Sequence, residues 1–168
     1  MTSARDDEAH RDIVSVFIAP PSQRPILAAL VDLSSAGLIA PFHWIEADAD
    51  AADHGAIAEA LARLNALPGR RGYVTRTFCE DSRYFQPANG MRIDSIRQAI
   101  ENDYAGTWLH PILLTSLLEA ADAVDSTVGI QMSYLKTWAP RSYKPLALRA
   151  PVLTPGRGRA LRADATKI

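Results

Sequence analysis

Ile13-Val14-Ser15-Val16-Phe17-Ile18-Ala19 is a run of β-branched and aromatic residues with the length of a strand. It is apolar on both faces apart from Ser15, as is typical of a strand covered on both sides. Pro20-Pro21 ends the run, and we expect a helix over 22–36 and a second strand over 42–47. Two strands joined by a helix lie parallel with a right-handed crossover. The sequence therefore predicts an α/β fold whose sheet opens with a strand–helix–strand unit, Rossmann-like or ferredoxin-like.

The rest of the chain predicts a helical pair and late strands at a sheet edge. Asp53 is expected to cap a helix that reaches Leu64, and 73–79 is expected to form a third strand. The helical pair would meet at Gly106, and 128–138 and 146–153 would supply the late strands. The expected core positions of the helical pair are Ile93, Ile96, Ile100, Leu113, Leu117, Ala120 and Val124.

The opening over 14–48 resembles that of ACT-type and PII-like regulatory domains. The 168 residues, 48% hydrophobic and 22% charged, fit one globular domain. We expect that domain over 12–154, between a disordered N-terminus, 1–11, and a loose basic tail, 155–168. The polar N-terminus is unlike a signal peptide and no run is apolar enough for a membrane helix, so we expect a cytoplasmic protein without a membrane partner.

Charge is distributed unevenly along the chain. Residues 1–60 carry three basic and ten acidic side chains, whereas 136–168 carry eight basic side chains and a single acid, Asp164. Such asymmetry indicates either a surface for an acidic partner or pairing of the two ends, within the fold or between subunits. Self-association and binding to nucleic acid are both open at this point.

The C-terminal third combines aromatic and basic residues in the pattern of a nucleic-acid-binding surface. Tyr134, Lys136 and Trp138 alternate, so a strand would place all three on one face. Rings that stack on bases and cations that meet phosphates are the elements of single-strand recognition. The segment 157–159, Arg-Gly-Arg, resembles the core of an AT-hook, with Ala160 where that motif has proline. The predicted nucleic-acid-binding residues are Tyr134, Lys136, Trp138, Arg141, Lys144, Arg157, Arg159 and Arg162.

A carboxylate cluster offers an alternative function. Glu46, Asp48 and Asp50 follow the second predicted strand and would share one face, and oxygen ligands suit Mg²⁺. Asp48-Ala49-Asp50 resembles the D-x-D of TOPRIM nucleases, which also carry a glutamate after their first strand, where this chain has 19–21, Ala-Pro-Pro. The alternative is a metal-dependent hydrolase or nuclease that uses these three residues.

Other motifs of catalysis are missing from the sequence. There is no G-x-G-x-x-G, P-loop or nucleophile elbow, and the four histidines lack the spacing of zinc ligands. Cys79, followed by two acids, is expected to be buried and unreactive. Residues 106–111, which lead into an apolar helix, are similar to a short signature in KilA-N DNA-binding domains. No catalytic residue is named, whether the chain is an enzyme stays open, and no cofactor is identified.

Taken together, these patterns favour a non-catalytic binding or regulatory protein whose basic, aromatic C-terminal region contacts an anionic partner, by preference nucleic acid. The metal-dependent hydrolase and a protein-interaction or oligomerisation module are the alternatives.

Overall fold

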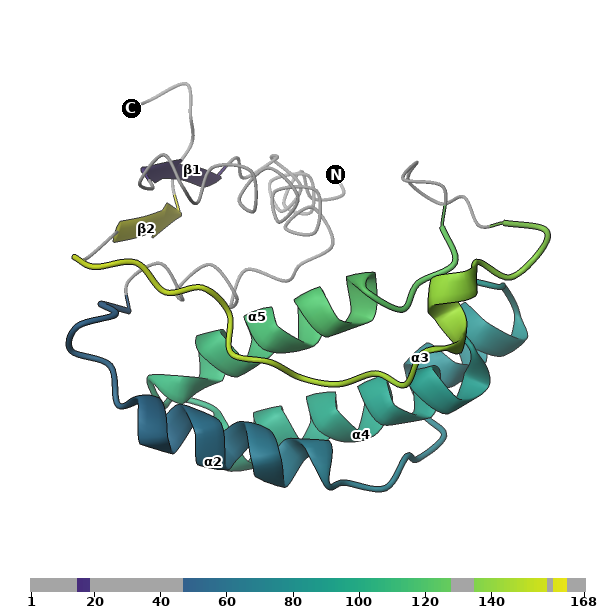
Figure 1. Cartoon of the computed structure of the whole chain (residues 1–168), viewed down its shortest axis with the longest axis horizontal. Coiled ribbons are helices and arrows are strands. Elements are labelled where there is room, and N and C mark those ends of the chain that lie inside the picture. Colours follow the sequence, from purple (N-terminus) through teal and green to yellow (C-terminus); the bar gives the residue numbers. More distant parts are fainter. Residues whose placement is uncertain (1–14, 19–46, 128–134, 157–158, 163–168) are drawn as a thin grey trace, which may run out of the picture. The chain divides into compact units, whose positions relative to one another are not determined.

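The computed structural model describes residues 15–18, 47–127, 135–156 and 159–162 (Figure 1). The chain divides into a helical unit, Ala52–Val152, and a terminal unit formed by Met1–Ala51 and Leu153–Ile168. Within the described residues, the helical unit contains α2 (His54–Asn65), α3 (Tyr73–Thr75), α4 (Pro87–Tyr104) and α5 (Leu109–Asp122), with a π-helix, η3 (Arg76–Glu80), and a 3-10 helix, η4 (Pro140–Tyr143).

The terminal unit contains two short strands, β1 (Ser15–Ile18) and β2 (Arg159–Arg162), which pair antiparallel. The register places Ser15 opposite Arg162 and Ile18 opposite Arg159. In the same unit the Ala49 N–H donates to the Thr154 carbonyl at 3.1 Å.

The predicted α/β fold is wrong, because the regular elements among the described residues are helices apart from the short strands β1 and β2. The first strand exists over Ser15–Ile18, but its partner is β2, and the pairing is antiparallel. An apolar β-branched run indicates a strand without indicating which segment will pair with it. The predicted helix 22–36 and strand 42–47, except Ala47, lie outside the described residues.

The core of the helical unit is formed by one face of each long helix. Asp53 caps the start of α2, as predicted, since its Oδ1 accepts the Ala56 N–H at 2.9 Å. Ile96 and Ile100 of α4 and Leu113 of α5 are fully buried. Burying each such side chain contributes about 1.5–3 kcal/mol. The predicted core positions of the helical pair are confirmed as buried: Ile93, Ile96, Ile100, Leu113, Leu117, Ala120 and Val124.

The turn between α4 and α5 agrees only in part with what the sequence predicts. Gly106 has a φ of 77°, a conformation that glycine adopts without strain, and it ends α4 as expected. The composition of the turn also suggests Thr107 as a cap for the helix that follows, but its side chain donates to the Tyr104 carbonyl at 2.7 Å instead and makes no cap for α5.

The predicted third strand over 73–79 is wrong, because this segment forms α3 and η3. Its backbone is held by α4 instead of by a neighbouring strand. Gly90 of α4 lies against η3 so closely that a Cβ would overlap the sulfur of Cys79 and come within 3.3 Å of the Thr75 Cα. Tertiary contacts therefore override the strand propensity of Tyr-Val-Thr.

Residues 144–152, the strap, run extended along the helical unit (Figure 1). Leu146 and Leu148 are buried and the residues beside them are exposed, which is the alternation that predicted a strand over 146–153. That prediction is wrong, since the described residues give the strap no strand partner, and residues 135–138 of the other predicted late strand are not in a strand either.

Two asparagine side chains take the place of a neighbouring strand. Asn89 of α4 donates to the carbonyls of Ser142 and Lys144, at 3.1 and 2.9 Å, and accepts the Leu146 N–H at 3.0 Å. Asn65 of α2 donates to the Leu148 carbonyl at 3.0 Å and accepts the Leu148 N–H at 2.9 Å. A side-chain amide presents the same donor and acceptor as a peptide group, so it can satisfy an extended backbone.

In the part of the chain that the structure describes, no helix combines the length and apolar character required to cross a membrane.

We predict that Asn89→Ala lowers the free energy of unfolding by about 3 kcal/mol, because buried backbone groups of the strap lose their partner. Asn102→Ala, which removes an exposed amide bonded only to Gln98 at 2.8 Å among the described residues, is the control and should cost little. Urea denaturation measures both. Equal stability of the two variants would contradict the role assigned to Asn89.

We predict that Gly90→Ala destabilises the protein by about 1–3 kcal/mol through overpacking, although alanine normally stabilises a helix relative to glycine. In a Cys79→Ala background the clash with sulfur is removed, and the same substitution should cost clearly less. Thermal unfolding of the four proteins tests this coupling. Additive effects would show that the close contact between α4 and η3 is not the cause.

Candidate functional site

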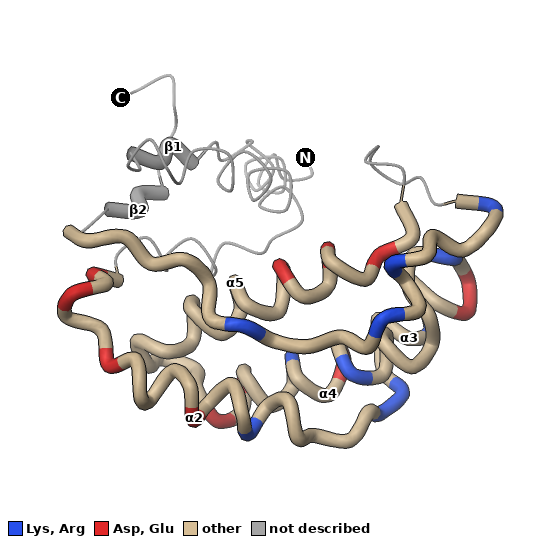
Figure 2. The backbone as a smooth tube through the Cα atoms, viewed as in Figure 1, with Lys and Arg blue, Asp and Glu red and all other residues tan. Residues whose placement is uncertain are grey.

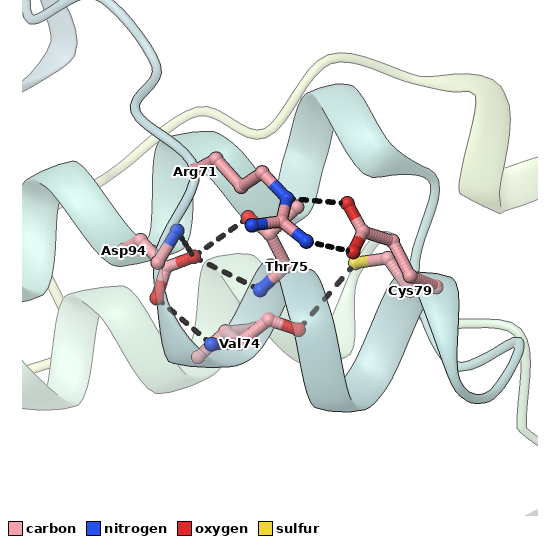
Figure 3. Close-up of polar contacts among 7 residues, drawn as sticks. Arg71, Val74, Thr75, Cys79 and Asp94 are labelled. Atoms are coloured by element: carbon pink, nitrogen blue, oxygen red, sulfur yellow. Dashed lines mark hydrogen bonds and ion pairs between the residues drawn. The ribbon is translucent and has the colours of Figure 1, made fainter.

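The scaffold of the site is α4, whose polar side chains hold the segments around it. Arg92 donates to the carbonyls of Asn65 and Leu67, at 3.0 and 3.1 Å, and so binds the end of α2 and the turn that follows it. Asp94 caps α3 from the side (Figure 3). Together with Asn89, these residues fix the end of α2, the start of α3 and the strap against a single helix.

Asp94 accepts four hydrogen bonds. The N–H groups of Gly72, Val74 and Thr75 donate to it at 2.9, 2.8 and 2.9 Å, and the Thr75 hydroxyl donates at 2.6 Å. Partial burial raises the pKa of this carboxyl, but the hydrogen bonds from Thr75, Val74 and Gly72 outweigh burial and lower the pKa overall. The folded state therefore stabilises the ionised form of the Asp94 carboxyl relative to the protonated form.

Cys79 lies next to this cap, on η3 (Figure 3). Burial, followed by the charges of Asp94 and Glu80, raises the pKa of the thiol to about 11. The raised pKa favours the protonated thiol near neutral pH, and the expectation of a buried cysteine is confirmed.

A cavity of about 580 Å³ lies between the connection from α2 to α3 and the side of α4. Cations and carboxylates are equal in number in its lining, so the lining offers no net attraction for an anion. The charged lining residues are Arg70, Arg71, Arg97, Asp94, Glu101 and Asp103.

The basic segment, residues 135–144, contains three cations and no acid. Figure 2 shows Lys and Arg gathered toward the end of the helical unit that carries α3. Lys136 and Lys144 are exposed and have no ion pair within the described residues. Arg141 forms an ion pair with Asp125 and donates from Nε to the Asp125 carbonyl at 3.0 Å.

Trp138 of the basic segment is half-buried and pairs with a residue from another part of the chain. The guanidinium of Arg83 lies 4.9 Å from the centre of the Trp138 ring system. The same guanidinium donates from Nη1 to the Lys136 carbonyl at 2.6 Å. This arrangement, the Arg83–Trp138 pair, is a cation–π contact reinforced by a charge-assisted hydrogen bond.

Ser126 joins the two segments that carry this pair. Its N–H donates to the Tyr84 carbonyl at 2.7 Å, and its own carbonyl accepts the Leu135 N–H at 2.9 Å. Its hydroxyl oxygen accepts the Ala139 N–H at 3.1 Å. Because Ser126 is fully buried, these bonds hold residue 84 and residues 135–139 together.

The structure thus brings together Lys136, Trp138, Arg141 and Lys144 of the predicted nucleic-acid-binding residues. Tyr134 and Arg157 lie outside the described residues, and Arg159 and Arg162 belong to β2 of the terminal unit.

Of the predicted metal ligands, Glu46 lies outside the described residues. Asp48 accepts the N–H groups of Asp50 and Gly156, at 3.1 and 3.0 Å, so its Oδ1 shapes a loop. Among the described residues, no three histidine, cysteine or acidic side chains are grouped so as to hold a metal ion.

Sequence patterns give no indication of Arg83 or Ser126 as functional residues. Arg83 stands in a polar segment with the composition of a turn, and Ser126 has no distinguishing neighbours. Their importance comes from contacts with residues far along the chain, which no local pattern indicates.

Two curated proteins are similar to part of the chain. The Type II methyltransferase M.NlaIII of Neisseria lactamica is 32% identical over 120 residues, 66% of this chain and 36% of the relative. The Type II methyltransferase M.CviAII of Paramecium bursaria Chlorella virus 1 is 38% identical over 88 residues, 50% of this chain and 26% of the relative. The chain therefore spans about a third or less of the length of these relatives. No family model and no solved structure matches it.

This partial homology to type II DNA methyltransferases, which are DNA-modifying enzymes, overturns the prediction of a non-catalytic binding or regulatory protein. The error has a physical source. A segment can belong to an enzyme without itself carrying a recognisable catalytic motif, so the lack of such motifs does not indicate a binding protein.

We predict that Asp94→Asn reduces the dependence of stability on acidic pH. The lowered pKa of Asp94 stabilises the fold at pH values above about 4, the ordinary pKa of the group, and this stabilisation is lost as the pH falls through the lower folded value. Wild-type stability should therefore fall more steeply below about pH 4 than that of the variant.

Asp103→Asn is the matched control, because this exposed carboxylate near the end of α4 is bonded to Arg63 at 2.7 Å and to no backbone group of α3. Urea unfolding at several pH values provides the comparison. An Asp94→Asn profile parallel to that of the wild type would contradict the effect of the four hydrogen bonds.

Proposed function

We propose that the chain acts within a type II DNA methyltransferase, and that its helical unit contacts DNA through the basic segment. The observation that carries the proposal is the homology to two type II methyltransferases, the first covering 66% of the chain. Methylation of DNA requires an enzyme to bind a duplex, and most of the affinity for a duplex comes from cations that neutralise phosphates.

The electrostatics of the basic segment support the same proposal. Lys136 and Lys144 are exposed without an ion pair among the described residues, so contact with phosphates would not break an existing salt bridge. Arg141 differs, because its guanidinium is engaged by Asp125. We therefore assign phosphate contact to the two lysines, and to Arg141 the role of holding the basic segment in place.

The remaining cations predicted from the sequence, Arg157, Arg159 and Arg162 with Tyr134, stay candidates for further DNA contacts. The three arginines suit a phosphate backbone, and the tyrosine ring suits stacking on a base. The proposal does not depend on them, since the helical unit supplies its own cations.

We predict that the full chain binds duplex DNA with an affinity that falls steeply with salt. Lys136→Gln with Lys144→Gln should flatten the slope of log affinity against log salt by about 0.9 for each phosphate that is no longer neutralised. Arg63→Gln removes one charge from a cation already paired with Asp103 and should leave the slope unchanged. Fluorescence anisotropy at several salt concentrations gives these slopes.

Methyl transfer is the second readout. A chimera of M.NlaIII that carries this chain in place of the matching segment should transfer labelled methyl groups from S-adenosylmethionine to DNA. A strong decrease in label on introducing the two lysine substitutions is the expected result. Absence of DNA binding by the full chain at low salt, or a folded chimera without methyl transfer, would contradict the proposal.

A further inference from the structure

Arg83 is held at two points without a carboxylate among the described residues, whereas the exposed arginines Arg63, Arg71 and Arg141 each pair with an acid. The central carbon of its guanidinium lies over the Trp138 ring, 4.9 Å from the ring centroid, and Nη1 is bonded to the Lys136 carbonyl at 2.6 Å. A guanidinium has five N–H donors in a planar fork. The other donors of Arg83 have no partner among the described residues, and the residue is exposed.

An arginine held in this way is prepared for binding an anion. A free arginine loses much rotamer freedom when its fork is fixed on a ligand, whereas the orientation of Arg83 is fixed in advance. The bond from Nη1 to Lys136 leaves Nε and Nη2 without a partner among the described residues, and this edge of a guanidinium can make bidentate hydrogen bonds to a phosphate. Lys136, exposed beside this pair, adds a second positive charge.

The contact between Arg83 and Trp138 also depends on Ser126. The bonds of Ser126 to the backbones of Tyr84, Leu135 and Ala139 join the loop of Arg83 to the basic segment. Trp138 is only partly exposed, and Arg83 occupies one side of its ring. Such a ring is less suited to stack on a base than to orient the guanidinium.

We propose that Arg83 contacts a phosphate of the DNA backbone and that Trp138 is its positioning residue. The inference rests on the proposed function, because the DNA duplex is the partner that the proposal supplies. It assigns to Trp138 a role different from base stacking, and it assigns phosphate binding to a residue outside the basic segment.

The test measures duplex binding by the full chain with Arg83→Gln, Trp138→Leu, Trp138→Phe and the double variant Arg83→Gln/Trp138→Leu. Arg83→Gln should weaken binding about tenfold and flatten the salt slope by about 0.9. Trp138→Leu should weaken binding about threefold in the wild-type background and not at all in the Arg83→Gln background. Trp138→Phe, which keeps a ring, should restore most of the affinity. The decrease in affinity should be the same for two duplexes of unrelated sequence.

Melting temperatures of the variants separate positioning from folding, since Trp138→Phe should fold even where Trp138→Leu loses stability. If Trp138→Leu lowers the affinity for the duplex by the same factor in the Arg83→Gln background as in the wild type, Trp138 itself contacts DNA and its positioning role is overturned. An unchanged affinity of Arg83→Gln, or a decrease confined to one duplex, overturns the phosphate contact. Failure of the wild-type chain to bind any duplex would instead overturn the proposed function.

Discussion

The backbone of the segments between the helices needs hydrogen-bond partners, and side chains of α4 provide them. Asn89 bonds the strap, Arg92 bonds the last carbonyls of α2, and Asp94 bonds the first N–H groups of α3. An unpaired buried backbone group costs about 1–3 kcal/mol. The three side chains lie within six consecutive residues of one helix, about one and a half turns, so the register of α4 sets where α2 ends, where α3 begins and how the strap runs. Gly90, between them, allows η3 to approach.

This constraint extends to the basic segment. Asn89 binds the carbonyls of Ser142 and Lys144, at one end of the segment, while Ser126 binds Leu135 and Ala139 toward the other. The segment has little regular structure of its own beyond η4. Its position is nevertheless defined, because each anchor is buried and part of a well-packed region. Functional side chains on irregular segments carried by a rigid scaffold are a common arrangement in binding proteins.

The sequence was sufficient where local chemistry decides the outcome. Asp53 caps α2, and the spacing of Ile93, Ile96 and Ile100 identifies the buried face of α4. It failed where a distant partner decides. Residues 146–153 alternate as a strand does because Leu146 and Leu148 face the core, yet their backbone is satisfied by asparagine amides. Residues 73–79 have the composition of a strand, but a carboxylate on α4 captures the N–H groups at their start and favours a helix.

The same distinction applies to the site. Composition predicted Lys136 and Trp138 as binding residues, but the contact on which the proposed role of Trp138 rests is made by Arg83, 53 residues from Lys136 along the chain. The structure also helps to explain the charge gradient, the change from an acidic N-terminal part of the chain to a basic C-terminal part. Had the cations of the basic segment been neutralised within the described residues, the gradient would have an internal explanation. Only Arg141 of these cations has an ion pair there, with Asp125. Lys136 and Lys144 have no ion pair among the described residues, which costs little free energy in water. Contact between these lysines and the phosphates of a duplex would be favourable, because it releases the counterions condensed on the duplex.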